Sequence, residues 1–62
     1  MKIHLIFQDE SPSPLKPFNL DAGQIQFVPQ IGDEISDGNH IRTVKAREFQ
    51  YSENDLTVRL RL

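Results

Sequence analysis

Apolar and polar residues alternate in several short segments of the chain, with the two-residue period of a β-strand. The clearest segment is the last, in which Leu56, Val58 and Leu60 share one face and Thr57 and Arg59 share the other. No segment carries the 3.6-residue apolar stripe of a helix. The alternation predicts strands over residues 2–7, 24–31, 34–36 and 56–62.

Residues 40–51 form the longest regular stretch, but the parity of their apolar positions changes along it. Ile41 and Phe49 occupy odd positions, whereas Val44 occupies an even one. A strand can exchange its faces only at a bulge or a sharp bend. We therefore expect either one long coiled strand or two strands with a kink near residue 43 or 47.

Turn residues separate the predicted strands. Residues 8–20 contain three prolines and predict a long loop that lies on the body of the protein. Gly32 and Asp33 suit a turn or bulge in which the Asp33 carboxylate binds backbone amides. Asp37 and Gly38 suit a tight hairpin turn, because an Asp-Gly pair tolerates positive φ.

The polar residues 52–55 predict a hairpin loop between the last two strands. Pairing across this loop brings apolar residues together on one face and an ion pair on the other. The expected pairs are Tyr51 with Leu56, Phe49 with Val58, and Glu48 with Arg59.

Five or so short strands, one of them strongly bent, predict an all-β fold. We expect a small five-stranded antiparallel barrel, SH3-like or half-open, with a long loop after strand one and a bent penultimate strand. The chain has 62 residues, which allows a single domain over residues 1–62 and no deep cleft. A domain this small buries only about 60% of its unfolded surface, so self-association is an expected aid to its stability.

Composition narrows the chemistry. The chain has no cysteine, which excludes disulfides, thiol nucleophiles and cysteine metal sites. No apolar run approaches the roughly 18 residues of a membrane span, and the N-terminal apolar stretch is too short for a signal peptide. We therefore expect a cytoplasmic protein with no membrane partner.

Catalytic chemistry finds little support. The two histidines, His4 and His40, lack metal-ligand spacing, and no nucleophile–base pair or cofactor loop accompanies them. The neighbouring acids Asp33 and Glu34 point to opposite faces of a strand, so they cannot act as a carboxylate pair. We expect no enzyme activity, no metal and no cofactor.

Charge is unevenly spread along the chain. Residues 1–40 carry two bases and six acids, whereas residues 41–62 carry five bases and three acids. A basic sheet face could bind nucleic acid, but the net charge is −2 and the aromatic residues are expected to face the core. Nucleic-acid binding is therefore the alternative hypothesis. Its candidate basic face consists of Arg42, Lys45, Arg59 and Arg61.

From residue 27 onward the chain carries a P-x-x-G-D-x-I segment, followed by a V-x-x-R-x-F-x-Y strand. The specified positions of these two patterns are Pro29, Gly32, Asp33, Ile35, Val44, Arg47, Phe49 and Tyr51. This arrangement resembles small bacterial and phage-borne all-β proteins that have no assigned activity. The resemblance implies an all-β fold and no catalytic residue. With the small size, it implies a phage or mobile-element protein that occludes a host protein.

A protein–protein interaction module is the leading hypothesis. The last strand, if it lies at the edge of the sheet, leaves backbone groups free to pair with a partner or with a second copy as a homodimer. Acidic loops would meet a basic partner surface. The candidate acidic contacts are Asp9, Glu10, Asp33, Glu34 and Asp37.

Overall fold

The computed structural model describes residues 1–9, 15–36 and 38–62 and shows a small, mostly-β fold in these ranges. Its main features are a four-stranded sheet, a two-stranded hairpin and one short 3-10 helix. The elements are β1 (Lys2–Gln8), β2 (Phe18–Asp21), η1 (Ala22–Phe27), β3 (Glu34–Ser36), β4 (Ile41–Thr43), β5 (Ala46–Tyr51) and β6 (Asp55–Arg61).

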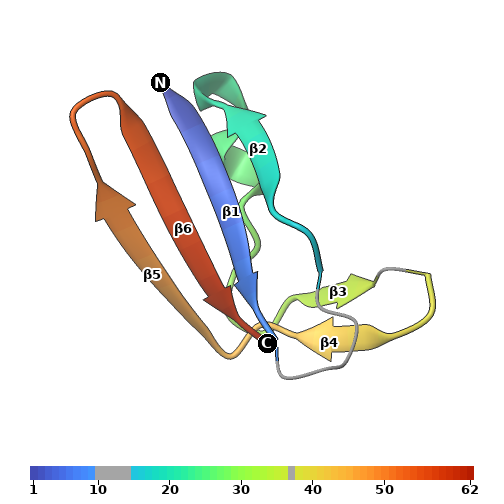
Figure 1. Cartoon of the computed structure of the whole chain (residues 1–62). Helices are drawn as coiled ribbons and strands as arrows, with labels where there is room; N and C mark the ends of the chain where they lie inside the picture. The colour runs from blue at the N-terminus through green and yellow to red at the C-terminus, as the bar shows by residue number, and fades with distance from the viewer. Residues whose placement is uncertain (10–14, 37) are drawn as a thin grey trace.

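The four-stranded sheet has the order β2-β1-β6-β5 (Figure 1). β1 and β6 run parallel to each other at its centre, and the two outer strands pair antiparallel with them. The expectation of an all-antiparallel sheet is therefore wrong, and the described residues form no closed barrel. The last strand does not meet the condition of lying at an edge, because β6 is flanked by β1 and β5.

The apolar alternation of β1 and β6 explains why the first and last strands lie side by side. In the parallel register, Ile3 lies beside Leu56 and Leu5 beside Val58. All four side chains are at most 4% exposed, and full burial of a side chain of this kind stabilises a fold by about 1.5–3 kcal/mol. Local sequence shows each apolar row but not its distant partner.

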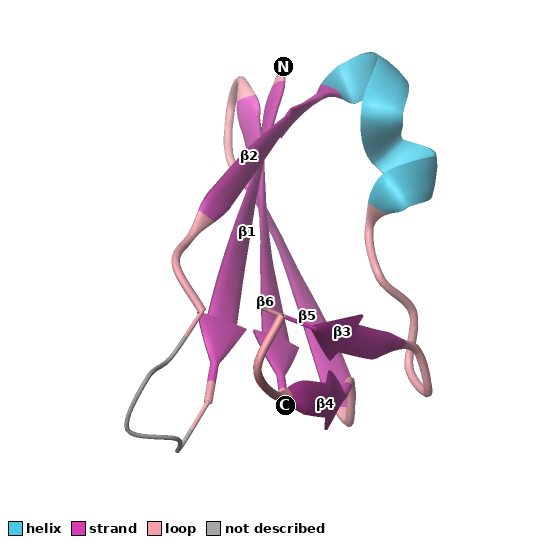
Figure 2. Cartoon of the chain, turned by 90° about the vertical axis from the view of Figure 1, so that its right-hand side faces the viewer, coloured by secondary structure: helices cyan, strands magenta, loops and turns pink. Residues whose placement is uncertain are grey.

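The core lies on one face of this sheet. Leu20 joins it from β2, whereas Val28 and Val44 reach it from segments outside the sheet. Figure 2 shows η1 and the β3–β4 hairpin on the same side of the sheet. The buried core residues are Ile3, Leu5, Leu20, Val28, Val44, Leu56, Val58 and Leu60.

The predicted strand over residues 24–31 is wrong. The backbone N–H of Asp21 donates to the side-chain oxygen of Gln24 at 2.9 Å, and Val28 N–H donates to the Ile25 carbonyl at 3.1 Å. These local bonds hold η1 as a helical turn, and Ile25 and Phe27 remain exposed. A short alternation is compatible with such a turn as well as with a strand.

The predicted loop over residues 8–20 misses β2. Pro17 lies immediately before this strand, so it removes no donor from the β1–β2 ladder. Leu20 lies opposite Ile3 and is buried, which gives the short strand its anchor. The rest of the loop prediction falls partly on residues 10–14, outside the described residues.

The predicted turn at Gly32 and Asp33 is confirmed. Gly32 has a φ of +95°, and Asp33 N–H donates to the Gln30 carbonyl at 2.9 Å. The Asp33 carboxylate accepts from Gln30 N–H at 2.8 Å, as expected. Gly32 N–H then donates to the Val44 carbonyl and Val44 N–H donates to the Asp33 carbonyl, so two residues oppose one in a β-bulge.

The predicted break within residues 40–51 is also confirmed, in its two-strand form. β4 belongs to the hairpin and β5 to the main sheet. Lys45 N–H donates to the Arg61 carbonyl at 2.7 Å, while the register also places Ala46 opposite Arg61. This second bulge changes the parity between Val44, which is buried, and the strand that follows.

The structure describes the turn of one predicted hairpin in full and that of the other in part. In the β5–β6 hairpin, the pairs Tyr51–Leu56, Phe49–Val58 and Glu48–Arg59 all occur in the predicted register. In the β3–β4 hairpin, Gly38 has the expected positive φ of +95°. Asp37 lies outside the described residues.

Candidate interaction surface

β5 is the exposed outer strand of the sheet. Among the described elements it contacts only β6, and Figure 1 shows no element on its outer side. Five of its six residues are exposed. This strand therefore offers a long free edge at the surface of the molecule.

The phase of the β5–β6 ladder shows which backbone groups point to the free edge. Ser52 N–H donates to the Asp55 carbonyl at 2.9 Å, next to the hairpin loop. Hydrogen-bonded pairs alternate along an antiparallel ladder, so residues 46, 48 and 50 bind β6. The N–H and C=O groups of Arg47, Phe49 and Tyr51 therefore point away from the sheet.

The same three residues carry their side chains on the core face of the sheet, at its margin. Tyr51 is 71% exposed and Phe49 is 39% exposed, although their cross-strand neighbours Leu56 and Val58 are fully buried. The Arg47 guanidinium carbon lies 5.1 Å from the centre of the Phe49 ring, in cation–π contact. We call Arg47, Phe49 and Tyr51, with their outward backbone groups, the β5 edge surface.

The Arg47 guanidinium makes two contacts, one with the Phe49 ring and one with the backbone of Pro29. Besides the ring contact, its Nη1 donates to the Pro29 carbonyl at 3.3 Å. This bond orients the guanidinium along the core face, over Phe49. The Arg47 guanidinium therefore lies on the core face beside the two aromatic rings and does not project from the free edge into solvent.

The opposite face of the sheet is mainly polar, and several of its side chains contact one another. Arg59 Nη1 donates to Glu48 at 2.8 Å and to Gln50 at 2.5 Å. His4 lies 2.9 Å from the Asn19 side-chain oxygen and 3.6 Å from the Asp55 carboxylate. No residue of this face is buried among those that the structure describes.

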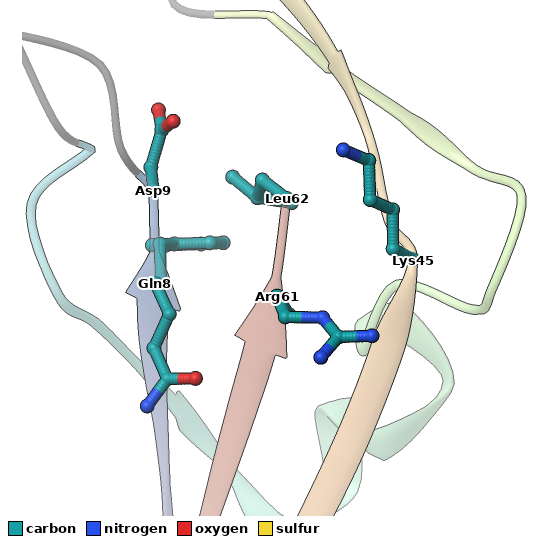
Figure 3. Close-up of a pocket in the computed structure, with 6 residues that line it drawn as sticks. Gln8, Asp9, Lys45, Arg61 and Leu62 are labelled. Atoms are coloured by element: carbon teal, nitrogen blue, oxygen red, sulfur yellow. The ribbon is translucent and has the colours of Figure 1, made fainter.

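The structure brings together only part of the candidate basic face. Arg59 and Arg61 share the polar face of β6, and Lys45 and Arg61 line one shallow hollow at the end of the sheet (Figure 3). Glu48 neutralises Arg59 within the pair described above. Phe7 and Leu62 form the apolar part of the hollow.

Arg42 lies apart from the other three candidate bases. Its Nε pairs with the Asp9 carboxylate, and each of these two side chains is only 9% exposed. Arg42 lies opposite Ile35 in the β3–β4 register, and Ile35 packs against the core. The pair thus fastens the hairpin to the end of β1, and neither charge lies on the polar face of the sheet.

The candidate acidic contacts are similarly divided. Asp9 pairs with Arg42, and Asp33 binds the amide of Gln30, so both serve the fold. Glu34 is exposed on β3. Glu10 and Asp37 lie outside the described residues.

An exposed ion pair marks the opposite edge of the sheet. Lys2 Nζ lies 2.8 Å from the Asp21 carboxylate, where β1 meets the end of β2. The hydrogen bond and charge of Lys2 lower the pKa of Asp21, and Asp21 in turn raises the pKa of Lys2. Both side chains are largely in solvent, so this pair contributes little to stability.

The described ranges contain neither a cluster of metal-ligating side chains nor a helix that could span a membrane. No group of three His, Asp or Glu side chains there could hold a metal ion. No helix in those ranges has the length and apolar character needed to cross a bilayer.

Comparison with known proteins returned no relative. No protein-family model, curated protein or solved structure matches the chain.

Sequence reasoning missed the β5 edge surface because it assigned Phe49 and Tyr51 to the core. Their parity is that of core residues, and the pairing with Val58 and Leu56 is as predicted. Their exposure follows from the elements that cover the sheet, since Val28 and Val44 are the only buried residues from outside it in the described ranges. The sequence did carry one indication of this exposure. Only 37% of its residues are apolar, which is too few to cover both the central strands and a strand with two aromatic residues.

Proposed function

We propose that this protein is a small protein–protein interaction module that binds through the β5 edge surface. The observation that carries the proposal is the combination of an uncovered edge strand and two exposed aromatic side chains on it. Free backbone groups give affinity for another strand, and neighbouring side chains give selectivity. Aromatic residues and arginine are enriched at the energetic centres of protein interfaces.

Two kinds of partner meet this chemistry. One is an extended segment of another protein, which agrees with the resemblance to phage-borne proteins that would occlude a host protein. The other is the β5 strand of a second copy. In both cases the partner adds a strand beside β5 and covers Phe49 and Tyr51.

Nucleic-acid binding is the weaker alternative. Lys45 and Arg61 remain together as exposed bases, but Arg59 is neutralised by Glu48 and Arg42 by Asp9. The exposed aromatics lie on the other face of the sheet, so bases stacked on them would not follow these charges. The proposal therefore favours a protein partner.

The test is capture from a lysate of cells that also make a second, differently tagged copy, with and without nuclease. A Phe49→Ser, Tyr51→Ser double variant removes the aromatic row. Phe18→Ser is the matched control, because Phe18 is an exposed aromatic on the opposite edge strand. We expect the wild type and the control, but not the double variant, to retain protein in both nuclease arms. Retention by the double variant, or recovery that requires nucleic acid, would contradict the proposal.

A further inference from the structure

We propose that the partner of the β5 edge surface is a second copy of this chain, bound by antiparallel β5–β5 pairing about a two-fold axis at Phe49. This inference rests on the proposed function and names its partner. It joins the two four-stranded sheets into one continuous sheet.

The hydrogen-bond phase of β5 fits this axis. The outward backbone groups belong to Arg47, Phe49 and Tyr51, as the ladder with β6 requires. With the axis at Phe49, this residue pairs with itself, and Arg47 pairs with Tyr51 of the second copy. Every outward group of the strand then finds a partner within the opposing strand.

Side-chain chemistry favours the same axis. Phe49 meets the Phe49 ring of the second copy, and Arg47 meets its Tyr51, which continues the cation–π contact already present within one chain. On the other face, Glu48 lies opposite Gln50 of the second copy, so no like charges meet there. In this register, therefore, no like charges lie opposite each other and each aromatic ring lies opposite another ring or an arginine.

Neighbouring axes are less favourable. An axis at Arg47 or at Glu48 places that charged residue opposite its own copy, which destabilises a strand pair. An axis at Gln50 pairs Arg47 with Glu53, which lies beyond the strand in the hairpin turn, so the outward groups of Arg47 lose their strand partner. Only the axis at Phe49 pairs each of the three outward residues of β5 with another of those residues.

The molecule leaves room for this arrangement at β5 and not at the opposite edge. Among the described helices and strands, β5 contacts β6 alone. β2 is four residues long, follows Pro17 and leads directly into η1, with which it is in contact. Dimer formation at β5 would also add burial to a domain whose size limits its own core.

The first test is the molar mass of the purified full chain, measured by sedimentation or light scattering over a range of concentrations. We expect a concentration-dependent dimer for the wild type. Phe49→Lys places two charges at the axis and should weaken the dimer at least about 100-fold, in the range reported for central interface residues. Phe18→Lys, with the same change at the β2 edge, should leave the dimer intact.

The second test determines the register, and the absence of native cysteine makes it selective. With the axis at Phe49, Glu48 and Gln50 of the second copy form a directly opposed pair about 4.5 Å apart between Cα atoms, which a disulfide can span. Each residue lies about 7–8 Å from its own copy, which a disulfide spans poorly. We therefore expect oxidation to cross-link a mixture of Glu48→Cys and Gln50→Cys chains, but neither variant alone.

The outcomes separate this inference from the function on which it rests. Cross-linking of Gln50→Cys alone or of Glu48→Cys alone would place the axis elsewhere and overturn the inference. A monomeric wild type at high concentration, with no cross-link in the mixture, would also overturn it. If the lysate experiment then recovers a different protein in a manner that requires Phe49 and Tyr51, the interaction module stands and only the second copy is excluded. The cysteine variants keep both aromatic residues, so their result does not depend on whether Phe49→Lys folds.

Discussion

The two edges of the four-stranded sheet differ in nearly every feature that controls strand pairing. β2 is short, is preceded by Pro17 and ends in η1, and its buried Leu20 anchors it to β1. β5 is longer, contacts only β6 among the described elements and carries Phe49 and Tyr51 exposed. One edge thus has the devices that natural sheets use against further pairing, while the other has few of them.

This difference shows how a small domain can direct its association. With too few residues to cover a whole sheet, the chain places its covering segments where Val28 and Val44 reach the central strands. The margin along β5 is left uncovered. The uncovered part is also the part with free backbone groups, so burial and hydrogen bonding by a partner fall at the same place.

The largest expected effect is the difference in stability loss between a substitution at the centre of the sheet and one at its open edge. Leu56→Ala removes a fully buried side chain from the β1–β6 contact and should lower the free energy of unfolding by about 3 kcal/mol. Tyr51→Ala, at the cross-strand neighbour, should change it by less than about 0.5 kcal/mol in dilute protein. Urea unfolding measures both. Equal losses would contradict the assignment of Tyr51 to an uncovered edge.

The next effect concerns the largely buried Asp9–Arg42 ion pair, which connects the β3–β4 hairpin to the end of β1. Asp9→Asn should lower the free energy of unfolding by about 2 kcal/mol, because it removes the Asp9 charge from its pair with Arg42 at a site that is only 9% exposed. Replacing both residues with leucine should recover much of this loss. Chemical unfolding of the two variants decides the point, and a further loss in the double variant would show that the pair itself stabilises the fold.

A smaller effect tests the turn that leads into β3. Gly32 has a φ of +95°, so Gly32→Ala should cost about 1–2 kcal/mol. Gly23→Ala is the matched control, because Gly23 lies in η1 without a positive φ and an added Cβ meets no atom within 4 Å. Thermal unfolding should place the Gly23 variant close to the wild type. A similar loss at both glycines would mean that the backbone at Gly32 is not the cause.

The smallest effect lies at the β2 edge and depends on pH. Lys2 lowers the pKa of Asp21 below its ordinary value of 3.8, so the pair's contribution is present above that value and is lost as the pH falls through the lowered pKa. The raised pKa of Lys2 means that its contribution is present below 10.5 and is lost as the pH rises through the raised pKa. The Tm of the wild type should slightly exceed that of Asp21→Asn at neutral pH. This small difference should disappear in strong acid and in high salt.

Local sequence was sufficient for much of the β5–β6 half of the protein. The strands, the hairpin loop and the register of the last two strands were all predicted, because alternation and turn residues act over a few positions. The turn at Gly32 was predicted for the same reason, since positive φ and a carboxylate cap are local requirements. The parity change within residues 40–51 likewise indicated a bulge or bend near residue 43 or 47, and the structure places the irregularity between them, at Lys45 and Ala46.

The candidate sites depended on information of another kind. Arg42 was grouped with Arg59 and Arg61 because all three lie in the last third of the chain. In the folded protein, however, Arg42 belongs to the β3–β4 hairpin and pairs with Asp9. The assignment of Phe49 and Tyr51 to the core came from parity, which gives the face of a strand but not what covers it. Residues 24–31 were predicted as a strand, whereas they form η1 and then lead to the turn at Gly32.

The sequence by itself determined the mostly-β class, the turn at Gly32, the break within residues 40–51 and the β5–β6 hairpin, because each depends on interactions between near neighbours. Only the tertiary structure decided that β1 and β6 pair in parallel at the centre and that β5 lies at the edge. Those features depend on contacts between residues at opposite ends of the chain, such as Ile3 and Leu56, and many pairings of apolar rows satisfy the same local pattern. The open edge is therefore a consequence of which rows meet and how few residues remain to cover them.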